Sequence, residues 1–206
     1  MWVQTLIVRN LDVHGKMRTF HPGDWLDVGR STALRWIAEG SARVLNRAVL
    51  SAALAGCGAV VQGDAGFLRG AFPELELIRA EDAPFALPFD RTLLISAPPA
   101  RVDLLGVGFR LVERWEVAAP IWSYDELAAH VGTEDDRAQT AAVVRDLRVP
   151  LYSPDLMFVR RTPTTRDFLR VWGDESASGG DPRLALLRAL YRVKPMICAL
   201  PTTWIA

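Results

Sequence analysis

The sequence predicts an α/β fold with a mainly parallel sheet, preceded by a small β-rich (α+β) module. Turn-rich, strand-like patterning ends near residue 46, and apolar strand-like runs then alternate with helical patterns to the end of the chain. One of these runs, Thr92–Ile95, is apolar without polar alternation, as expected of a strand covered on both faces. Such alternation favours parallel strands joined by helices. We therefore predict two domains, residues 1–46 and residues 47–206.

The first domain is predicted from turn and cap signals. Pro22 and Gly23 suit the special backbone angles of a turn. Ser31 can accept hydrogen bonds from the free N–H groups at a helix start, and Gly40 suits the helix end. The predicted elements are a strand over Val3–Arg9, a turn over His21–Asp24, a strand over Trp25–Val28, a helix over residues 32–39 and a strand over Ala42–Leu45.

This order of turn, strand, capped helix, glycine and strand resembles a module found in bacteriophage head-region and accessory proteins. The positions that match its pattern are Gly15, Pro22, Gly23, Asp24, Val28, Ala33, Ile37, Gly40 and Ala42. The resemblance implies a virion protein of the head, neck or decoration type, located in the virion or the host cytoplasm. The alternative is an ordinary β-rich cap in which Pro-Gly-Asp is only a turn.

The second domain carries stronger cap signals. Ser123–Glu126 has capping-box spacing, before a helix that Gly132 would close. The acidic residues of Thr133–Asp136 fit the positive end of the next helix, and we interpret them as a first-turn pattern and not as a metal site. Thr162 and Pro163 suit the cap and first position of another helix. The other predicted elements are helices over residues 47–55 and Asp181–Arg192, strands over Ala59–Val61, Leu75–Ile78, Thr92–Ile95, Leu156–Val159 and Met196–Leu200, and a flexible loop over Gly173–Gly180.

Three segments of this domain resemble, in order, nucleotide-sugar glycosyltransferases of the GT-A fold. They are residues 88–104, 150–163 and 181–204. In that family the first segment reads P-F-D-R-T-L-Y-L-D-A-D-T, and the second reads Y-N-S-G-V-L-L-F-R-R-T-P. The third has a D-Q-x-A-L helix and then a strand ending in L-P-x-x-W-N. The resemblance implies a reduced GT-A-like domain over about 150 residues.

The chain departs from the family where the family does its chemistry. The family's D-x-D motif binds a divalent metal that bridges the diphosphate, and hard cations need oxygen ligands. Here that motif becomes Ser96-Ala97-Pro98, and the family's N-S-G becomes Ser153-Pro154-Asp155. Asp181 is kept, while Pro182 replaces the glutamine and Ile205 replaces the final asparagine. We therefore expect a pseudoenzyme with no metal, no cofactor and no catalytic residue.

Composition excludes several other classes. A formal net charge of zero argues against a nucleic-acid-binding protein, and no apolar run reaches the ~20 residues that cross a bilayer. The N-terminus lacks a signal-peptide pattern, so Cys57 and Cys198 are expected to be reduced thiols. The three histidines lack the spacing of metal ligands, and no Gly-rich phosphate-binding motif is present.

We expect a non-catalytic phage or prophage structural or assembly protein, whose partners are protein subunits in a homo- or hetero-oligomer. Trp115 and Trp122 flank Ala118-Ala119-Pro120 and are the best candidates for a contact surface. One alternative is a metal-independent glycosyltransferase with Asp181 or Asp155 as the base on an acceptor hydroxyl. Its diphosphate charge would be offset by arginines chosen from Arg91, Arg101, Arg160 and Arg161. Another is a carbohydrate-binding module that uses Trp122.

Overall fold

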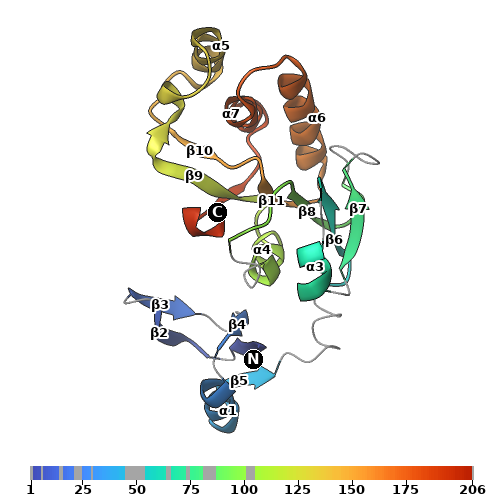
Figure 1. Cartoon of the computed structure of the whole chain (residues 1–206), viewed down its shortest axis with the longest axis vertical. Coiled ribbons are helices and arrows are strands. Elements are labelled where there is room, and N and C mark those ends of the chain that lie inside the picture. The colour runs from blue at the N-terminus through green and yellow to red at the C-terminus, as the bar shows by residue number, and fades with distance from the viewer. Residues whose placement is uncertain are drawn as a thin grey trace. The chain divides into compact units, whose positions relative to one another are not determined.

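The computed structural model describes residues 2–5, 7–13, 16–20, 25–28, 30–44, 54–63, 66–72, 75–80, 87–100 and 105–205 (Figure 1). The chain divides into two compact units, Met1–Ala55 and Gly56–Ala206. The predicted boundary between residues 46 and 47 lies outside the described residues, as do most of the predicted helix over residues 47–55 and the turn at His21–Asp24.

The N-terminal unit is a small α+β structure. Its elements are β1 (Trp2–Thr5), β2 (Arg9–Val13), β3 (Lys16–Phe20), β4 (Trp25–Asp27), α1 (Arg30–Ala38) and β5 (Ala42–Val44). Strand β1 lies between β4 and β5 in an antiparallel sheet, and β2 and β3 form a separate hairpin. Trp36 packs with Val3, Ala33 and Ala42 in a small core.

Two details of this unit differ from the prediction, and one is confirmed. The predicted strand over Val3–Arg9 is divided between β1 and β2. Ser31 lies inside α1, which begins one residue earlier at Arg30, so this serine is not the N-cap. Gly40 ends the helix in the left-handed region, with φ of 68°. Glycine adopts the left-handed conformation after a helix more easily than other residues, so Gly40 alone was enough to predict where α1 ends.

The C-terminal unit is built on a mixed sheet. Its strands are β6 (Cys57–Val61), β7 (Glu76–Arg79), β8 (Arg91–Ile95), β9 (Val117–Leu127), β10 (Pro150–Tyr152), β11 (Leu156–Arg160) and β12 (Ile197–Leu200). Strand β6 is parallel to β7 and β8, and β12 is parallel to β9. Strand β11 is antiparallel to both β8 and β9, and β10 is antiparallel to β9. The α/β class is confirmed, but the sheet is less parallel than predicted.

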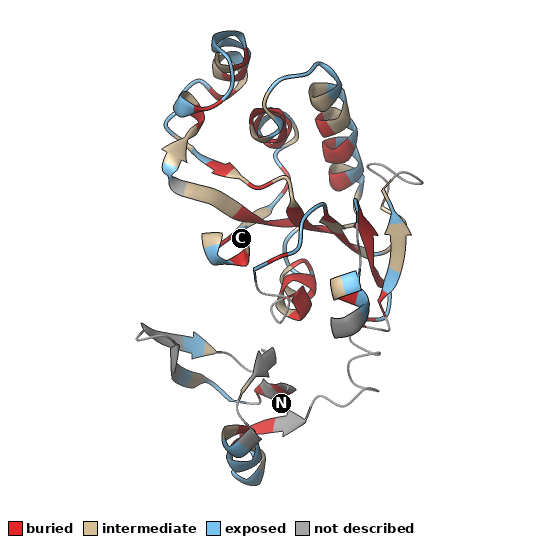
Figure 2. Cartoon of the chain, viewed as in Figure 1, coloured by how far each residue is buried: buried red, intermediate tan, exposed pale blue. Residues whose placement is uncertain are grey.

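Helices cover both sides of this sheet. They are α3 (Gly66–Ala71), α4 (Leu105–Leu111), α5 (Glu134–Val144), α6 (Pro163–Ala177) and α7 (Pro182–Val193), with short 3-10 helices η2 (Ala128–His130) and η3 (Thr202–Trp204). Helices α6 and α7 lie on one side, and α3 and α4 lie on the other (Figure 1). The buried residues concentrate on the central strands and on the helix faces that meet them (Figure 2). No helix among the described residues has the length and apolar character needed to span a membrane.

The starts of three predicted helices are confirmed, and each carries a side-chain cap. The Thr133 side chain accepts a hydrogen bond from the backbone N–H of Asp136 at the start of α5. Thr162 forms a reciprocal capping box with Thr165 at the start of α6, and Pro163 is its first residue. Asp181 accepts from the N–H of Arg183 at the start of α7. Caps are set by residues two or three positions apart, which is why the sequence predicts them well.

Two predicted elements are wrong. Ser123–Glu126 does not start a helix, because β9 continues through it to Leu127. The Ser123 hydroxyl does accept from the N–H groups of Asp125 and Glu126, but it does so in an irregular stretch where the pairing of β9 with β10 shifts register. The predicted loop over Gly173–Gly180 is also wrong, because α6 continues to Ala177 and only the last residues turn away.

Candidate functional site

The first two glycosyltransferase-like segments meet at one end of the sheet. Ser96 directly follows β8 and Asp155 directly precedes β11, and these strands are antiparallel, with Ile95 opposite Leu156. The Ser96 backbone N–H donates to the Asp155 carbonyl at 3.0 Å, and the Ser96 hydroxyl donates to Asp155 Oδ1 at 2.6 Å. The position expected for the first metal-binding carboxylate is thus occupied by a hydroxyl that bonds the neighbouring acid.

The third segment joins the same end of the sheet through Trp204. The Trp204 carbonyl accepts from the N–H of Ala100 at 3.1 Å. Its buried ring meets the ring of Phe158 edge-on at 5.9 Å, and Phe158 in turn meets Phe109 at 5.3 Å. The aromatic contact therefore joins the second and third segments, and the hydrogen bond from Ala100 holds Trp204 beside the chain that follows Ser96.

A proline in β9 shapes the turn that carries Asp155. Phe158 lies opposite Ala118, so the same register would place Leu156 opposite Pro120 and would require an N–H that proline lacks. The Pro120 carbonyl instead accepts from the N–H of Ser153 at 2.8 Å. Residues 153–155 therefore leave the ladder as a turn between β10 and β11, in the manner of prolines at sheet irregularities. This turn projects Asp155 toward Ser96.

This end of the sheet offers little to a metal ion. Ala97 and Pro98 are exposed and have no side-chain oxygen, and Asp155 is half-buried against Ser96. Across the described parts of the chain, no group of three or more His, Cys, Asp or Glu side chains is arranged to hold a metal. A single carboxylate can accept a proton, but it does not supply the several oxygen ligands that Mg²⁺ or Mn²⁺ requires.

The same edge continues to a small polar cavity with two arginines. The cavity has a volume of about 190 Å³ and lies where β6 and β7 end. Among its lining residues are Gly63, Arg69 and Arg79. Val61 pairs with both Arg79 and Ile95, so the cavity and Ser96 lie at the same edge. Three strand spacings, roughly 15 Å, separate the ends of β7 and β11.

These arginines were not among the predicted site residues. Guanidinium groups at the carboxyl ends of parallel strands suit an anionic ligand. Arg79 could have been noticed as a cation that closes a buried strand, but only the parallel pairing of β6 with β7 places it beside Arg69.

Asp181, the second candidate base, lies in a different cluster. Its carboxylate makes two contacts with the Arg183 guanidinium, at 3.0 and 2.6 Å. Arg183 also bonds Glu126 at 3.1 Å and lies over the ring of Trp122, 5.1 Å from its centroid. One face of Trp122 is therefore covered by a cation, and its Nε1–H donates to Glu126 at 2.9 Å. No described contact links this cluster to Asp155.

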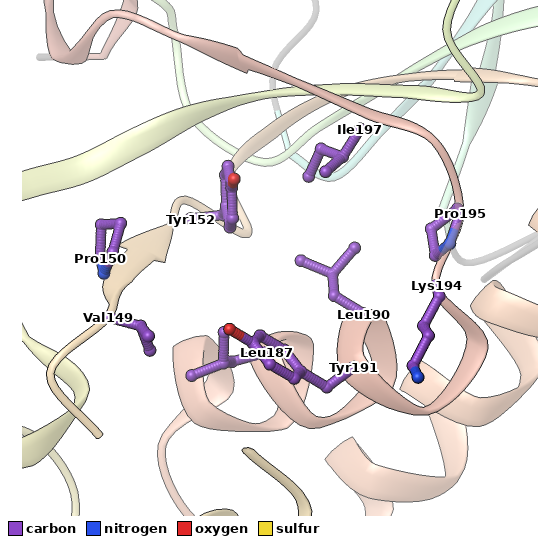
Figure 3. A pocket seen from close by; sticks show the side chains of 9 residues that line it. All are labelled: Val149, Pro150, Tyr152, Leu187, Leu190, Tyr191, Lys194, Pro195 and Ile197. Atoms are coloured by element: carbon purple, nitrogen blue, oxygen red, sulfur yellow. The ribbon is translucent and has the colours of Figure 1, made fainter. Parts of the chain in front are cut away.

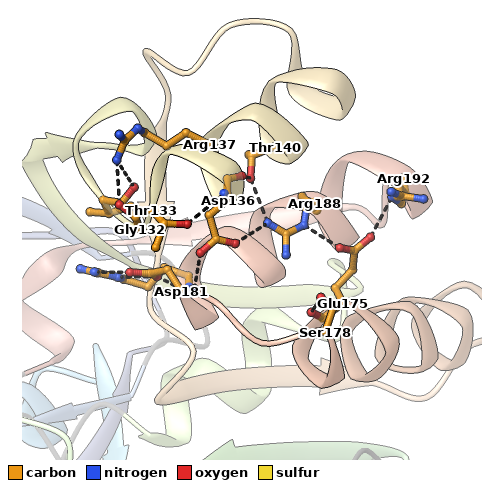
Figure 4. A network of polar contacts seen from close by, with 12 residues as sticks. Gly132, Thr133, Asp136, Arg137, Thr140, Glu175, Ser178, Asp181, Arg188 and Arg192 are labelled. Atoms are coloured by element: carbon orange, nitrogen blue, oxygen red, sulfur yellow. Dashed lines mark hydrogen bonds and ion pairs between the residues drawn. The ribbon is translucent and has the colours of Figure 1, made fainter.

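A buried network ties the same cluster to three helices (Figure 4). Asp136 of α5 accepts from the N–H of Asp181 at 2.9 Å. Arg188 of α7 bonds Thr140 at 3.0 Å, reaches Asp136 at 3.5 Å and bonds Glu175 of α6 at 2.5 Å. The Arg188 side chain is only 1% exposed. The network joins α5, α6 and α7. Asp181 therefore has two structural roles: its side chain caps α7, and its backbone N–H bonds Asp136 of α5.

We predict that the free energy of unfolding falls at acid pH as the Asp181 carboxylate becomes protonated. Burial opposes ionisation, but hydrogen bonds from the side chain and the backbone of Arg183 outweigh it and hold the Asp181 pKa below its ordinary value. A lowered folded-state pKa means that the stabilisation is fully present above pH ~4, the unfolded pKa, and is lost as pH falls through the folded pKa.

We therefore expect Asp181→Asn, which preserves the cap, to cost about 1 kcal/mol at pH 7 and less as pH falls below 4. Urea unfolding of both proteins along a pH series measures this difference. A cost that stays constant with pH would show that the carboxylate charge is not the stabilising feature.

The other predicted site residues lie elsewhere. Arg160 ends β11 and lies opposite Arg91, the first residue of β8. Arg161 bonds Asp90 next to this pair, at the end of the two strands that is away from Asp155 and Ser96. Five residues of strand, roughly 15 Å, separate them from Asp155 and place them at the opposite edge of the sheet, away from a diphosphate bound at the edge that carries Asp155. Trp115 is 40% exposed at the start of β9. Arg101 lies outside the described residues.

Trp115 and Trp122 do not form one patch. Trp115 precedes β9 and Trp122 lies within it, seven positions later, a span of roughly 20 Å in extended chain. Trp115 keeps the exposure expected of a contact residue, whereas Trp122 is partly covered by Arg183.

Comparison with known proteins gives a weak likeness. No family model matches the sequence, and no curated protein matches it. Among solved structures, a protein assigned as a nucleotide-diphospho-sugar transferase from Desulfovibrio desulfuricans G20 is similar at 14% identity with a TM-score of 0.35. The match covers 72% of this chain and 62% of that one, so the chain spans less than two thirds of that structure. A TM-score this low does not establish a shared fold.

Proposed function

We propose that the chain is a non-catalytic structural or assembly protein of a phage or prophage, built on a scaffold similar to that of nucleotide-sugar transferases. The observation that carries the proposal is the contact between Ser96 and Asp155. At the end of β8, where such enzymes place metal-binding carboxylates, the chain has Ser96-Ala97-Pro98, and the nearest acid is bonded by the serine hydroxyl. The virion association rests on the resemblance of residues 1–46 to phage modules.

A thermal-shift series tests the absence of nucleotide-sugar binding. We expect no shift with UDP-, GDP-, CMP- or dTDP-sugars, with or without Mn²⁺, whereas a ligand at about 100 times its Kd would add roughly 2.7 kcal/mol of stability. The matched variant is Ser96→Asp/Pro98→Asp, which restores the acidic pair and is expected to gain a shift with Mn²⁺. A shift of the unmodified protein with one nucleotide sugar would contradict the proposal.

A metal-independent glycosyltransferase remains the second candidate because of the polar cavity. Arg69 and Arg79 would hold the nucleotide end of the donor through its phosphate charge. Asp155, roughly 15 Å away along the same edge, would accept the acceptor's proton at the sugar end. This candidate predicts sugar transfer without added metal that is lost in both Arg79→Ala and Asp155→Asn. Transfer that survives both substitutions would exclude this assignment of roles.

A further inference from the structure

Strand β12 is an open edge of the sheet. Both β11 and β12 pair with Val117 and Ala118 of β9, so they lie on opposite sides of β9. Within the described residues, β12 pairs with no other strand. One long side of β12 therefore faces away from the sheet.

The backbone groups on that open side can be assigned. The Met196 carbonyl accepts from the N–H of Val117 at 3.1 Å, and in a parallel ladder alternate residues face the same neighbour. Cys198 and Leu200 therefore direct their backbone groups to β9. Ile197 and Ala199 direct an N–H and a carbonyl each to the open side, which gives four free hydrogen-bonding groups.

The other open edges of the described sheet are charged, irregular or interrupted by proline, and β12 is none of these. Strand β10 has three residues, begins with Pro150 and pairs with β9 in an irregular register. Strand β7 has exposed Glu76 and Arg79 at its ends. The outer half of β9 carries Asp125 and Glu126 and is irregular there. Charges and irregularities of this kind block pairing between edges. Strand β12 is Ile-Cys-Ala-Leu.

Apolar surface surrounds the same strand. The exposed large hydrophobic side chains described in the C-terminal unit are Trp115, Tyr191 and Met196. Met196 precedes β12, and Glu116, next to Trp115, bonds the Met196 carbonyl. A cavity of about 380 Å³ reaches β12 at Ile197, where Tyr191 and other α7 side chains face Tyr152 and Ile197 (Figure 3). An apolar hollow and exposed apolar side chains next to an open strand suit a self-complementary contact.

We infer that β12 pairs antiparallel with β12 of a second copy of this chain across a two-fold axis. Pro195 and Pro201 bracket the strand and cannot donate, so only the register that places Ile197 opposite Ala199 of the partner copy uses all four open groups on each strand. In that register the Cys198 residues of the two copies lie directly opposite each other, at a position where the two strands exchange no backbone hydrogen bonds. The Cα atoms of such a pair lie about 4.5 Å apart, within the range of a disulfide.

Oxidative cross-linking tests the register. Mild oxidation of the native protein with diamide is expected to give a covalent dimer on non-reducing gels. The dimer should be lost in Cys198→Ser and retained in Cys57→Ser, because Cys57 is buried whereas Cys198 is partly exposed. Burial raises the pKa of both thiols, that of Cys57 to about 11, so the oxidation is run at mildly alkaline pH. Diamide is the oxidant in this step: it accepts two electrons and two protons and is reduced to its hydrazine, while the two thiols become one disulfide. Cross-linking that survives Cys198→Ser would overturn the register.

Sedimentation tests the interface without the cysteine. Met196→Asp is expected to raise the dimer Kd about tenfold or more, whereas Leu34→Asp, at 53% exposure against 52% for Met196, should leave it unchanged. Ala199→Pro removes one open N–H and should also weaken the dimer, while Ala199→Ser keeps that N–H and should not.

A monomer at all concentrations up to about 300 µM, where a micromolar dimer would be saturated, would overturn the inference. The interface does not depend on the proposed function, so a monomeric result would leave the nucleotide-sugar test unaffected. Conversely, a thermal shift with a nucleotide sugar would contradict the proposed function and would not affect the inferred dimer.

Discussion

Replacement of Arg188 by alanine is expected to lower the free energy of unfolding by about 3–5 kcal/mol, because removal of one member of a buried ionic network leaves its partners uncompensated. Asp136 would lose its cation while staying at 6% exposure, and Glu175, at 14% exposure, would keep only its pair with the half-exposed Arg192. Thr140 would lose a donor as well. Urea unfolding followed by circular dichroism measures the change.

Arg170→Ala is the matched control for this prediction. Arg170 also pairs with two carboxylates, those of Asp167 and Asp174, but its side chain is 64% exposed. Exposed pairs contribute about 0–1 kcal/mol, so its loss should be small. Similar costs for the two arginines would show that burial does not govern the contribution of Arg188.

Phe158→Ala is the second substitution with a large expected effect, at about 3–5 kcal/mol. The Phe158 ring is fully buried between Phe109 and Trp204. A Cβ placed on Gly108 would lie 2.2 Å from this ring, so the ring already fills the available space. Its removal leaves a cavity under Trp204, and thermal and urea unfolding should both record the loss.

A double-mutant cycle checks that the space beside Gly108 is the cause. Gly108→Ala alone should cost about 1–3 kcal/mol through overpacking. In a Phe158→Leu background, the smaller side chain should relieve part of that cost, so the two changes should not be additive. Strict additivity would locate the cost of Gly108→Ala in the backbone of α4 and not in the aromatic ring.

The sequence predicted those elements whose signals are local. Thr133, Thr162 and Asp181 cap helices with groups two or three residues away, and no distant contact opposes them. Ser123 has the same local hydrogen bonds, yet the pairing of β9 with β10 holds the chain extended there. The last turn of α6 stays helical despite its small residues because Glu175 bonds Arg188.

The candidate site shows the same division. The resemblance predicted which residues replace the metal ligands, and the structure joins Ser96 and Asp155 of two separate segments. The predicted strand over Leu156–Val159 has Asp155 before it and Arg160 and Arg161 after it, so the sequence already separated these residues to opposite ends of β11. Arg69 and Arg79, in contrast, come together only through the register of β6 and β7.

Pro120 has a consequence for how this turn is inherited. The conformation of residues 153–155 is encoded in part by a residue more than 30 positions earlier, which belongs to none of the three glycosyltransferase-like segments. A residue with an N–H at position 120 would restore one of the two donors that a continuous ladder lacks here, the other being that of Pro154, and would favour a less pronounced turn at Asp155. The residues at positions 153–155 and the residue at position 120 should therefore change together among descendants of this chain.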